Sequence, residues 1–272
     1  KEIAIPIFLN LFIKTPLLLI LTSDLMSPYY HKLYFLSIIV AFITYYHSLS
    51  KNLVCYNKSM FDTAQQLIQS ANNIVIIQAE NPDGDSLGSS LALEEVLSDL
   101  GKTVTLYCPV DIPKYLRYIR GWDRVVGDFP AHADATIIVD TSADVLLSKV
   151  LETPGVRHFL ETHPVLVVDH HTAESTLSFE HTMLSDTVVA TGELLYQLFT
   201  HAGWTINQQA AENLLIAIMS DSLGLTTPNT TAATFHVAGE LTKLGASNAE
   251  IEERRREFMK KSPEILAYKG KL

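Results

Sequence analysis

Short apolar, β-rich runs alternate with longer helical patterns from residue 60 onward, and this alternation limits the fold more than any other feature of the chain. Strand-like runs joined through helices predict a parallel sheet with helices on its faces. The predicted strands are Asn73–Gln78, Thr103–Tyr107, Ala135–Asp140, Val165–Asp169 and a weaker Leu177–His181. We therefore expect an α/β fold with a parallel five-stranded sheet flanked by helices.

Helical patterns dominate the second half of this region. No strand-like run follows Asp186, so we expect the later helices to form a layer that completes the site. The predicted helices cover residues 61–71, 86–100, 143–151, 187–202, 207–220, 230–244 and 248–261. The charged run Glu252–Arg256 is typical of a solvated helix face.

Residues 1–59 differ in composition from the rest of the chain. Residues 1–50 carry only two acidic side chains and are rich in Ile, Leu, Phe and Tyr. The apolar runs Ile3–Thr22 and Leu33–Tyr46 favour a helical extension and are compatible with a transmembrane hairpin, although the second is shorter than the usual span of about 20 residues. The alternative is a non-native upstream segment, because Met60 would be a natural start before an amphipathic helix.

Charge and cysteine usage exclude some classes of protein. The formal net charge of -10 argues against a general nucleic-acid coat, because phosphate binding needs a basic surface. A small anionic substrate held through cations stays compatible with this charge. Cys55 and Cys108 have neither metal-site spacing nor a disulfide framework, which indicates a reducing compartment. We expect a cytoplasmic catalytic domain, with membrane contact through residues 1–50 left open.

Two carboxylates follow the first predicted strand. Asp83 and Asp85 lie one residue apart in a turn shaped by Pro82 and Gly84. This spacing lets the carboxylates diverge toward two metal positions, which lie about 3.5–4 Å apart in two-metal phosphoryl hydrolysis. The alternative is an Asx-turn with a helix N-cap, which Asp and Gly also favour. Asp-Gly-Asp alone does not decide between these interpretations.

Further oxygen and imidazole donors occur at the ends of later elements. Asp140 ends the third strand, the Asp-His-His tripeptide 169–171 ends the fourth, and Asp221 follows the apolar helix Leu214–Met219. Each has an ordinary alternative: a helix N-cap, an exposed histidine pair and a turn residue, respectively. Because the carboxyl ends of parallel strands meet at one edge of a sheet, their combination predicts a divalent-metal site there.

This combination resembles the DHH phosphoesterase family, named for its Asp-His-His motif. The resemblance covers roughly residues 60–270. The motifs that carry it are Asn81–Ser89, Asp140-Thr141-Ser142, Asp169-His170-His171, Asp221 with Thr226–Thr231, and the family-like segment Asp186–Glu193. The branch that matches best comprises nanoRNases and pAp phosphatases. The resemblance divides the chain into the extension 1–59, a catalytic domain over 60–245 and a helical linker over 246–272 that leads toward a missing C-terminal substrate-binding domain.

The resemblance implies two divalent ions, Mn²⁺ or Mg²⁺. Asp140 would bridge them, since it belongs to both sets of ligands. The implied ligands are Asp83 and Asp140 for the first ion, and Asp85, Asp140, His170 and Asp221 for the second.

Other residues of the motifs receive catalytic or binding roles from the same resemblance. Asp169 would orient His170, as a carboxylate beside a ligating imidazole does. His171 would contact the scissile phosphate or protonate the leaving oxygen. Ser89, in the first helix after the Asp-Gly-Asp motif, joins His171 as a substrate-binding residue. A homodimer is left open.

One departure from the family pattern affects the first metal position. The family has a histidine ligand four residues before the first aspartate, where this chain has Ala79. The remaining ligands there are oxygen atoms, which favours Mg²⁺ over Mn²⁺. Glu80 is adjacent, but strand alternation aims it elsewhere.

The implied function is metal-dependent hydrolysis of short oligoribonucleotides or nucleotide phosphoesters by an activated water. Two alternatives stay open. The first is a nucleotide- and metal-binding relative with weakened catalysis, because Ala79 removes an imidazole. The second is a membrane-anchored cyclic-di-AMP phosphodiesterase, which the apolar segment before the catalytic domain would suit.

Overall fold

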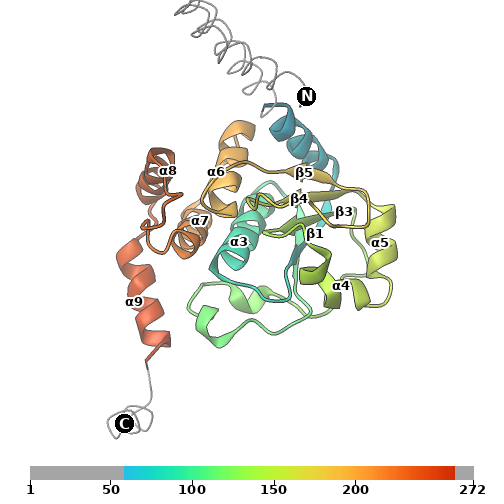
Figure 1. The fold of residues 1–272 in the computed structure, drawn as a ribbon, viewed down its shortest axis with the longest axis horizontal. Helices are drawn as coiled ribbons and strands as arrows, with labels where there is room; N and C mark the ends of the chain where they lie inside the picture. The colour runs from blue at the N-terminus through green and yellow to red at the C-terminus, as the bar shows by residue number, and fades with distance from the viewer. Residues whose placement is uncertain (1–57, 261–272) are drawn as a thin grey trace, which may run out of the picture. The chain divides into compact units, whose positions relative to one another are not determined.

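A parallel sheet forms the centre of the structure (Figure 1). The computed structural model describes residues 58–260. Its strands are β1 (Asn73–Gln78), β2 (Thr103–Tyr107), β3 (Ala135–Val139), β4 (Val165–Val168) and β5 (Thr182–Leu184). The strand order is β2-β1-β3-β4-β5, and every neighbouring pair is parallel. Since the chain places β2 on one side of β1 and β3 on the other, the sheet has a switch point between β1 and β3, where such sheets bind ligands.

Helices cover both faces of the sheet. The α-helices after β1 are α3 (Gly84–Asp99), α4 (Ser148–Glu152), α5 (Val156–Thr162), α6 (Thr191–Ala202), α7 (Gln208–Asp221), α8 (Ala232–Lys243) and α9 (Asn248–Phe258). A helix over residues 58–70 precedes β1, and short 3₁₀ segments occur at Lys114–Leu116, Trp122–Arg124 and Asp144–Leu147.

Alternating residues of the strands enter two separate apolar cores. Ile74 and Ile76 of β1 pack in the core that includes the helix over 58–70, α3, α6 and α7. Val75 and Ile77 pack in the core that includes α4 and α5. The strands are apolar almost throughout because both faces are buried.

Helix α3 packs closely against α7, and this contact places the two helix ends that flank the site. Gly88 makes the close approach feasible, because a Cβ atom there would lie 2.6 Å from the carbonyl oxygen of Asn213. Figure 1 shows α7 alongside α3, with α8 and α9 continuing beyond α7. The helical second half predicted from sequence is confirmed.

The predicted sheet is confirmed, although the fifth strand lies elsewhere. The sequence predicted Leu177–His181, whereas β5 is Thr182–Leu184, paired with β4. The apolar residues of the predicted run have another role, since Phe179 is buried in the core beside α5. Burial of an extended loop thus produced an alternating pattern without strand pairing.

Two predicted helices also differ from the observed ones. The single helix predicted over 143–151 is a 3₁₀ turn over Asp144–Leu147 followed by α4. The helix predicted from residue 187 begins at Thr191, because residues 187–190 form an irregular segment with bends whose last residue, Ala190, is the extended N-cap. The short helix α5 has no strong periodic signal and was not predicted.

The apolar extension 1–59 lies almost wholly outside the described residues, as do residues 261–272 of the predicted linker. The two alternatives considered for it, a membrane hairpin and a non-native upstream segment, therefore lie outside what the structure tests. Within residues 58–260, no helix combines the length and apolar content that crossing a bilayer requires.

Candidate metal centre

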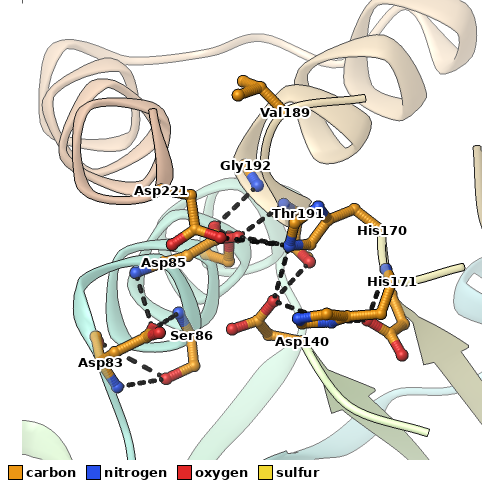
Figure 2. Close-up of polar contacts among 12 residues, drawn as sticks. Asp83, Asp85, Ser86, Asp140, His170, His171, Val189, Thr191, Gly192 and Asp221 are labelled. Atoms are coloured by element: carbon orange, nitrogen blue, oxygen red, sulfur yellow. Dashed lines mark hydrogen bonds and ion pairs between the residues drawn. The ribbon is translucent and has the colours of Figure 1, made fainter. Parts of the chain in front are cut away.

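Polar side chains reach one edge of the sheet from four places in the fold. The turn after β1 leads into α3 with Asp85, Asp140 follows β3, and the Asp-His-His tripeptide follows β4. Asp221 is the last residue of α7 and reaches the same place from the helical layer. Figure 2 shows their side chains converging between α3, α7 and the strand ends.

The side chains converge on one nitrogen atom, His170 Nε2. It lies 3.2 Å from Asp221 Oδ2, 3.6 Å from Asp140 Oδ1 and 3.7 Å from Asp85 Oδ2. The nitrogen is buried and has no hydrogen-bond partner among the described residues. Ligand atoms of Asp85, His170 and Asp221 all lie within 4.8 Å of one another, and the same holds for Asp140, His170 and His171. These oxygen and imidazole donors fit a divalent cation, which would satisfy the unpaired nitrogen.

Asp85 is fixed in place by a helix that begins 106 residues later. Its Oδ2 accepts a hydrogen bond of 2.7 Å from the amide of Thr191, and its Oδ1 accepts one of 3.0 Å from the amide of Gly192. These amides belong to the first turn of α6, which has no side-chain cap of its own. The carboxylate is completely buried. Burial, followed by the nearby charge of Asp221, raises the pKa of Asp85 to about 7.

Asp140 has an unusual backbone conformation at the end of β3. Its φ of 65° lies in the left-handed region, which Asp tolerates better than most residues and which is often found at functional sites. Its Oδ1 accepts a hydrogen bond of 2.9 Å from the hydroxyl of Thr191. Burial and the charges of Asp85 and Asp83 raise the pKa of Asp140 well above its usual value.

The ring of His170 is oriented by a backbone carbonyl. Its Nδ1 lies 3.3 Å from the carbonyl oxygen of Val188, so a proton on Nδ1 leaves Nε2 free to bind a cation. Burial opposes the charged imidazolium, but the contact with Asp221 and the charge of Asp85 outweigh it and raise the pKa of His170. Without a cation, the cluster therefore retains protons to a higher pH than the same groups do when free in water.

Asp169 contacts His171 and not His170, which corrects the sequence-based role of Asp169. Its Oδ1 lies 2.6 Å from His171 Nδ1 and also accepts the His171 amide at 3.1 Å. Its Oδ2 accepts a hydrogen bond of 2.8 Å from the hydroxyl of Ser142. Alternation explains the difference, because the side chains of adjacent residues at a strand end point in different directions. The bond to Asp169 raises the pKa of His171, whose side chain is 55% exposed.

Comparison with known proteins identifies the family. The sequence model described as the DHH family, N-terminal domain, matches residues 73–218. The chain belongs to the DHH family. Its Asp-His-His tripeptide is thus the DHH motif, and the resemblance predicted from sequence is confirmed.

Relatives of this DHH-family chain include enzymes of two kinds. It is 30% identical over 184 residues to the bifunctional oligoribonuclease and PAP phosphatase NrnA of Thermus thermophilus, covering 66% of this chain and 53% of that one. It is 27% identical over 189 residues to a probable manganese-dependent inorganic pyrophosphatase of Streptococcus agalactiae, covering 66% and 58%. The chain thus spans little more than half the length of these relatives.

A solved structure shares the fold. An exopolyphosphatase-related protein from Bacteroides fragilis superposes with a TM-score of 0.67 at 22% identity, covering 78% of this chain and 64% of that one. This similarity concerns the fold of the DHH domain.

Asp83 is not part of the DHH cluster around His170. Its Oδ1 accepts hydrogen bonds from the amides of Asp85 and Ser86 at 3.0 and 2.9 Å, so it is the N-cap of α3. In Figure 2 it lies against the first turn of α3, apart from the imidazole groups. The N-cap alternative considered from sequence accounts for this aspartate, and neither group of close metal-type donors among the described residues includes it.

Ser89 lies behind Asp85 and contacts that carboxylate. It is completely buried, and its hydroxyl donates a hydrogen bond of 3.0 Å to Asp85 Oδ1. The structure gives this hydroxyl another contact than the predicted one with substrate, because its position one helical turn after Asp85 directs it to that carboxylate. It positions Asp85.

Residues 79 and 80 offer no replacement for the family's histidine. Ala79 is buried and has only a methyl group to present. Glu80 points to α4, where its Oε2 accepts hydrogen bonds from the hydroxyl of Ser148 and the amide of Lys149. The prediction that Glu80 is aimed elsewhere is confirmed.

Sequence reasoning missed three residues that position the cluster, namely Thr191, Val188 and Ser142. Thr191 contacts both Asp85 and Asp140, and the other two orient His170 and Asp169. A signal was present, because Thr191 and Val188 lie in the family-like segment 186–193. Contacts made by a backbone carbonyl or amide, however, do not depend on residue type and so cannot be recognised in the sequence.

Proposed function

We propose that this chain is a hydrolase of phosphoesters in short nucleotides, and that a divalent cation, Mn²⁺ or Mg²⁺, binds to Asp85, Asp140, His170 and Asp221. One observation carries the proposal: the buried His170 Nε2 lacks a hydrogen bond and faces carboxylate oxygens 3.2–3.7 Å away. The relatives named as an oligoribonuclease and PAP phosphatase and as a manganese-dependent pyrophosphatase support phosphate chemistry with a metal.

A bound divalent cation supplies Lewis acidity toward a phosphoryl oxygen and lowers the pKa of water at the site. The protein residues supply the remaining parts. Thr191 and Gly192 hold the Asp85 carboxylate through their amides, so the ligand does not need to reorganise. Asp169 accepts the Nδ1 proton of His171, which leaves Nε2 of this half-exposed ring available to a phosphate oxygen or the leaving oxygen.

Hydrolysis of adenosine 3′,5′-bisphosphate and of a dinucleotide with Mn²⁺ or Mg²⁺ tests this function. We expect metal-dependent release of phosphate or mononucleotide, and a loss in kcat on the order of 100-fold or more in His170→Ala. His236→Ala is the matched control, because this histidine lies on α8 with a 72% exposed side chain. Turnover that needs no metal, or equal rates in both variants, contradicts the proposal.

A second function is favoured by Ala79 and Asp83. Ala79 lacks an imidazole, and the Asp83 carboxylate already caps α3. A chain with a single cation site would bind metal and nucleotide with little turnover. One bound Mn²⁺ per chain by calorimetry, with no detectable hydrolysis, would favour this binding function over the enzyme.

Restoring the histidine separates these two functions. In Ala79→His we expect a second bound Mn²⁺ and faster hydrolysis, because the new imidazole restores the ligand that the family has at this position. Ala71→His is the control, since Ala71 is also buried but precedes β1 at the other end of the strand. Unchanged metal stoichiometry in Ala79→His means that residue 79 does not face a cation.

A further inference from the structure

A pocket lies next to the metal centre, and the contact between the first turn of α3 and the last turn of α7 separates the two. Gly84 in the first turn of α3 touches Ser220 in the last turn of α7, since a Cβ atom at residue 84 would lie 2.5 Å from the Ser220 hydroxyl. Asp85 and Asp221 follow these residues and face His170. Asp83, Gly84 and Ser220 also line a pocket of about 580 Å³. The two sites therefore share the same pair of helix ends.

The floor of the pocket is apolar. Leu116, Ile216 and Ile251 line it, and all three are buried. These residues come from the 3₁₀ segment Lys114–Leu116, from α7 and from α9. A volume of this size suits a small organic molecule, and an apolar floor with a few polar groups is the usual lining of such sites.

Exposed apolar side chains form the rim. Tyr115 is 51% exposed, Leu223 73% and Met259 52%, and all three line the pocket. Leu223 also has a φ of 48°, in the left-handed region that a side chain of this size rarely adopts. Because Leu223 is exposed, burial of its side chain does not offset the cost of this backbone conformation. Such residues cluster at ligand-binding sites, where strain is retained for contact with a partner.

Polar groups at the rim can contact a ring edge or a sugar. Arg255 lines the pocket and is held by Glu252 through bonds of 2.9 and 2.8 Å. Tyr118 lines it as well, and burial raises the pKa of its phenol, so the hydroxyl stays neutral and can donate a hydrogen bond. The pocket thus combines an aromatic ring, an apolar floor and hydrogen-bonding groups.

We propose that this pocket binds the nucleoside portion of the substrate, with the base against Tyr115 and Leu223 and the phosphate at the metal centre. The proposal rests on the proposed phosphoesterase function and specifies its substrate class. A carboxylate cluster with a cation can bind any phosphate, including one without a base. An adjacent apolar pocket with a half-exposed tyrosine ring gives preference to a nucleotide, because every base has a π-face that can stack on it.

Binding of adenosine tests the pocket independently of catalysis. We expect saturable chemical-shift changes at the methyl groups of Met219, Leu223 and Met259 when uncharged adenosine is added to the full chain. Removal of the ring in Tyr115→Ala should weaken this binding about tenfold, whereas Tyr115→Phe keeps the ring and should change it less than threefold. Phe235→Ala is the matched control, because Phe235 is 56% exposed and lies outside the pocket lining. No saturable change at these methyl groups overturns the proposal.

Kinetics give the second arm. In Tyr115→Ala we expect KM for adenosine 3′,5′-bisphosphate to rise about tenfold at nearly constant kcat. Leu223→Gly should raise KM about threefold without loss of fold, since glycine accepts the left-handed backbone. Equal KM values in the wild type and in both variants overturn the proposed binding of the nucleoside in this pocket, even if hydrolysis occurs. If hydrolysis is absent but adenosine binds at Tyr115, the phosphoesterase function fails while the nucleoside pocket stands.

Discussion

The Asp85 carboxylate accepts a hydrogen bond of 2.7 Å from the amide of Thr191, the first residue of α6. One side chain thus caps a helix from another part of the chain and also faces the candidate metal position. Asp221, in contrast, lies at the end of α7, and its carboxylate contacts the ring of His170. The two carboxylates would share a cation but differ in what they do for the fold.

This difference predicts stability effects of different size. Asp85→Ala leaves the amides of Thr191 and Gly192 without an acceptor, so the metal-free protein should lose about 1–3 kcal/mol of unfolding free energy. Asp221→Asn loses no backbone bond and should change it by less than about 1 kcal/mol. Urea unfolding in EDTA measures both, and both variants should lose tight Mn²⁺ binding. Equal stability of the two variants would contradict the capping role of Asp85.

The metal-free protein should lose stability as the pH rises. The folded pKa of Asp85 is about 7 against an ordinary value of 3.8, so the folded state holds this proton more tightly between those values and its advantage disappears through that window. The raised pKa values of His170 and His171 act in the same direction. The lowered pKa of Asp169 acts oppositely, but only as the pH falls through the acidic range below its ordinary value.

Calorimetry at several pH values checks this prediction. The melting temperature in EDTA should fall between about pH 5 and pH 8, and the increase caused by Mn²⁺ should grow over the same range, because the cation binds deprotonated ligands. A metal-free melting temperature that rises over this range would contradict the raised pKa values of the cluster.

The pairing of Asp169 with His171 predicts a selective pKa change. In Asp169→Asn the pKa of His171 should fall, because the bond to Asp169 is the largest cause of its elevation. The pKa of His170 should remain nearly constant, since its contacts are to Val188, Asp221 and Asp85. Titration of the imidazole resonances in the metal-free protein measures both. A change confined to His170 would restore the role predicted from sequence.

Close packing of α3 on α7 can be tested with a pair of glycines. Gly88→Ala should cost about 1–3 kcal/mol, because the added Cβ atom meets the backbone of α7 at 2.6 Å. Gly239→Ala is the control in α8, where the added Cβ atom meets no other described element within 4 Å, and should stabilise the protein by about 0.5–1 kcal/mol. Similar melting temperatures for the two variants would contradict the packing.

Local sequence patterns predicted the sheet better than the site. β1 and β2 were predicted with their observed bounds, because buried parallel strands are continuous apolar runs between turn residues. The fifth strand was misplaced because Phe179 is buried from a loop, and periodicity does not distinguish burial from strand pairing.

Residue type identified the cluster but not each role within it. Asp85, Asp140, His170 and Asp221 were predicted as ligands and do lie together. Asp83 has the same chemistry as Asp85, yet its contacts are those of an N-cap. Which carboxylate caps a helix and which faces the cluster depends on segments far apart in the chain. Local pattern does not contain that information.

Anomalous diffraction from a Mn²⁺-soaked crystal of the full chain tests the central claim most directly. We predict a peak at coordination distance, about 2.0–2.5 Å, from His170 Nε2 and from carboxylate oxygens of Asp85 and Asp221. Asp140 should complete the ligand set, and the peak should be absent in crystals of His170→Ala. A wild-type crystal with no peak at this cluster, or with a peak that does not contact His170, would contradict the account.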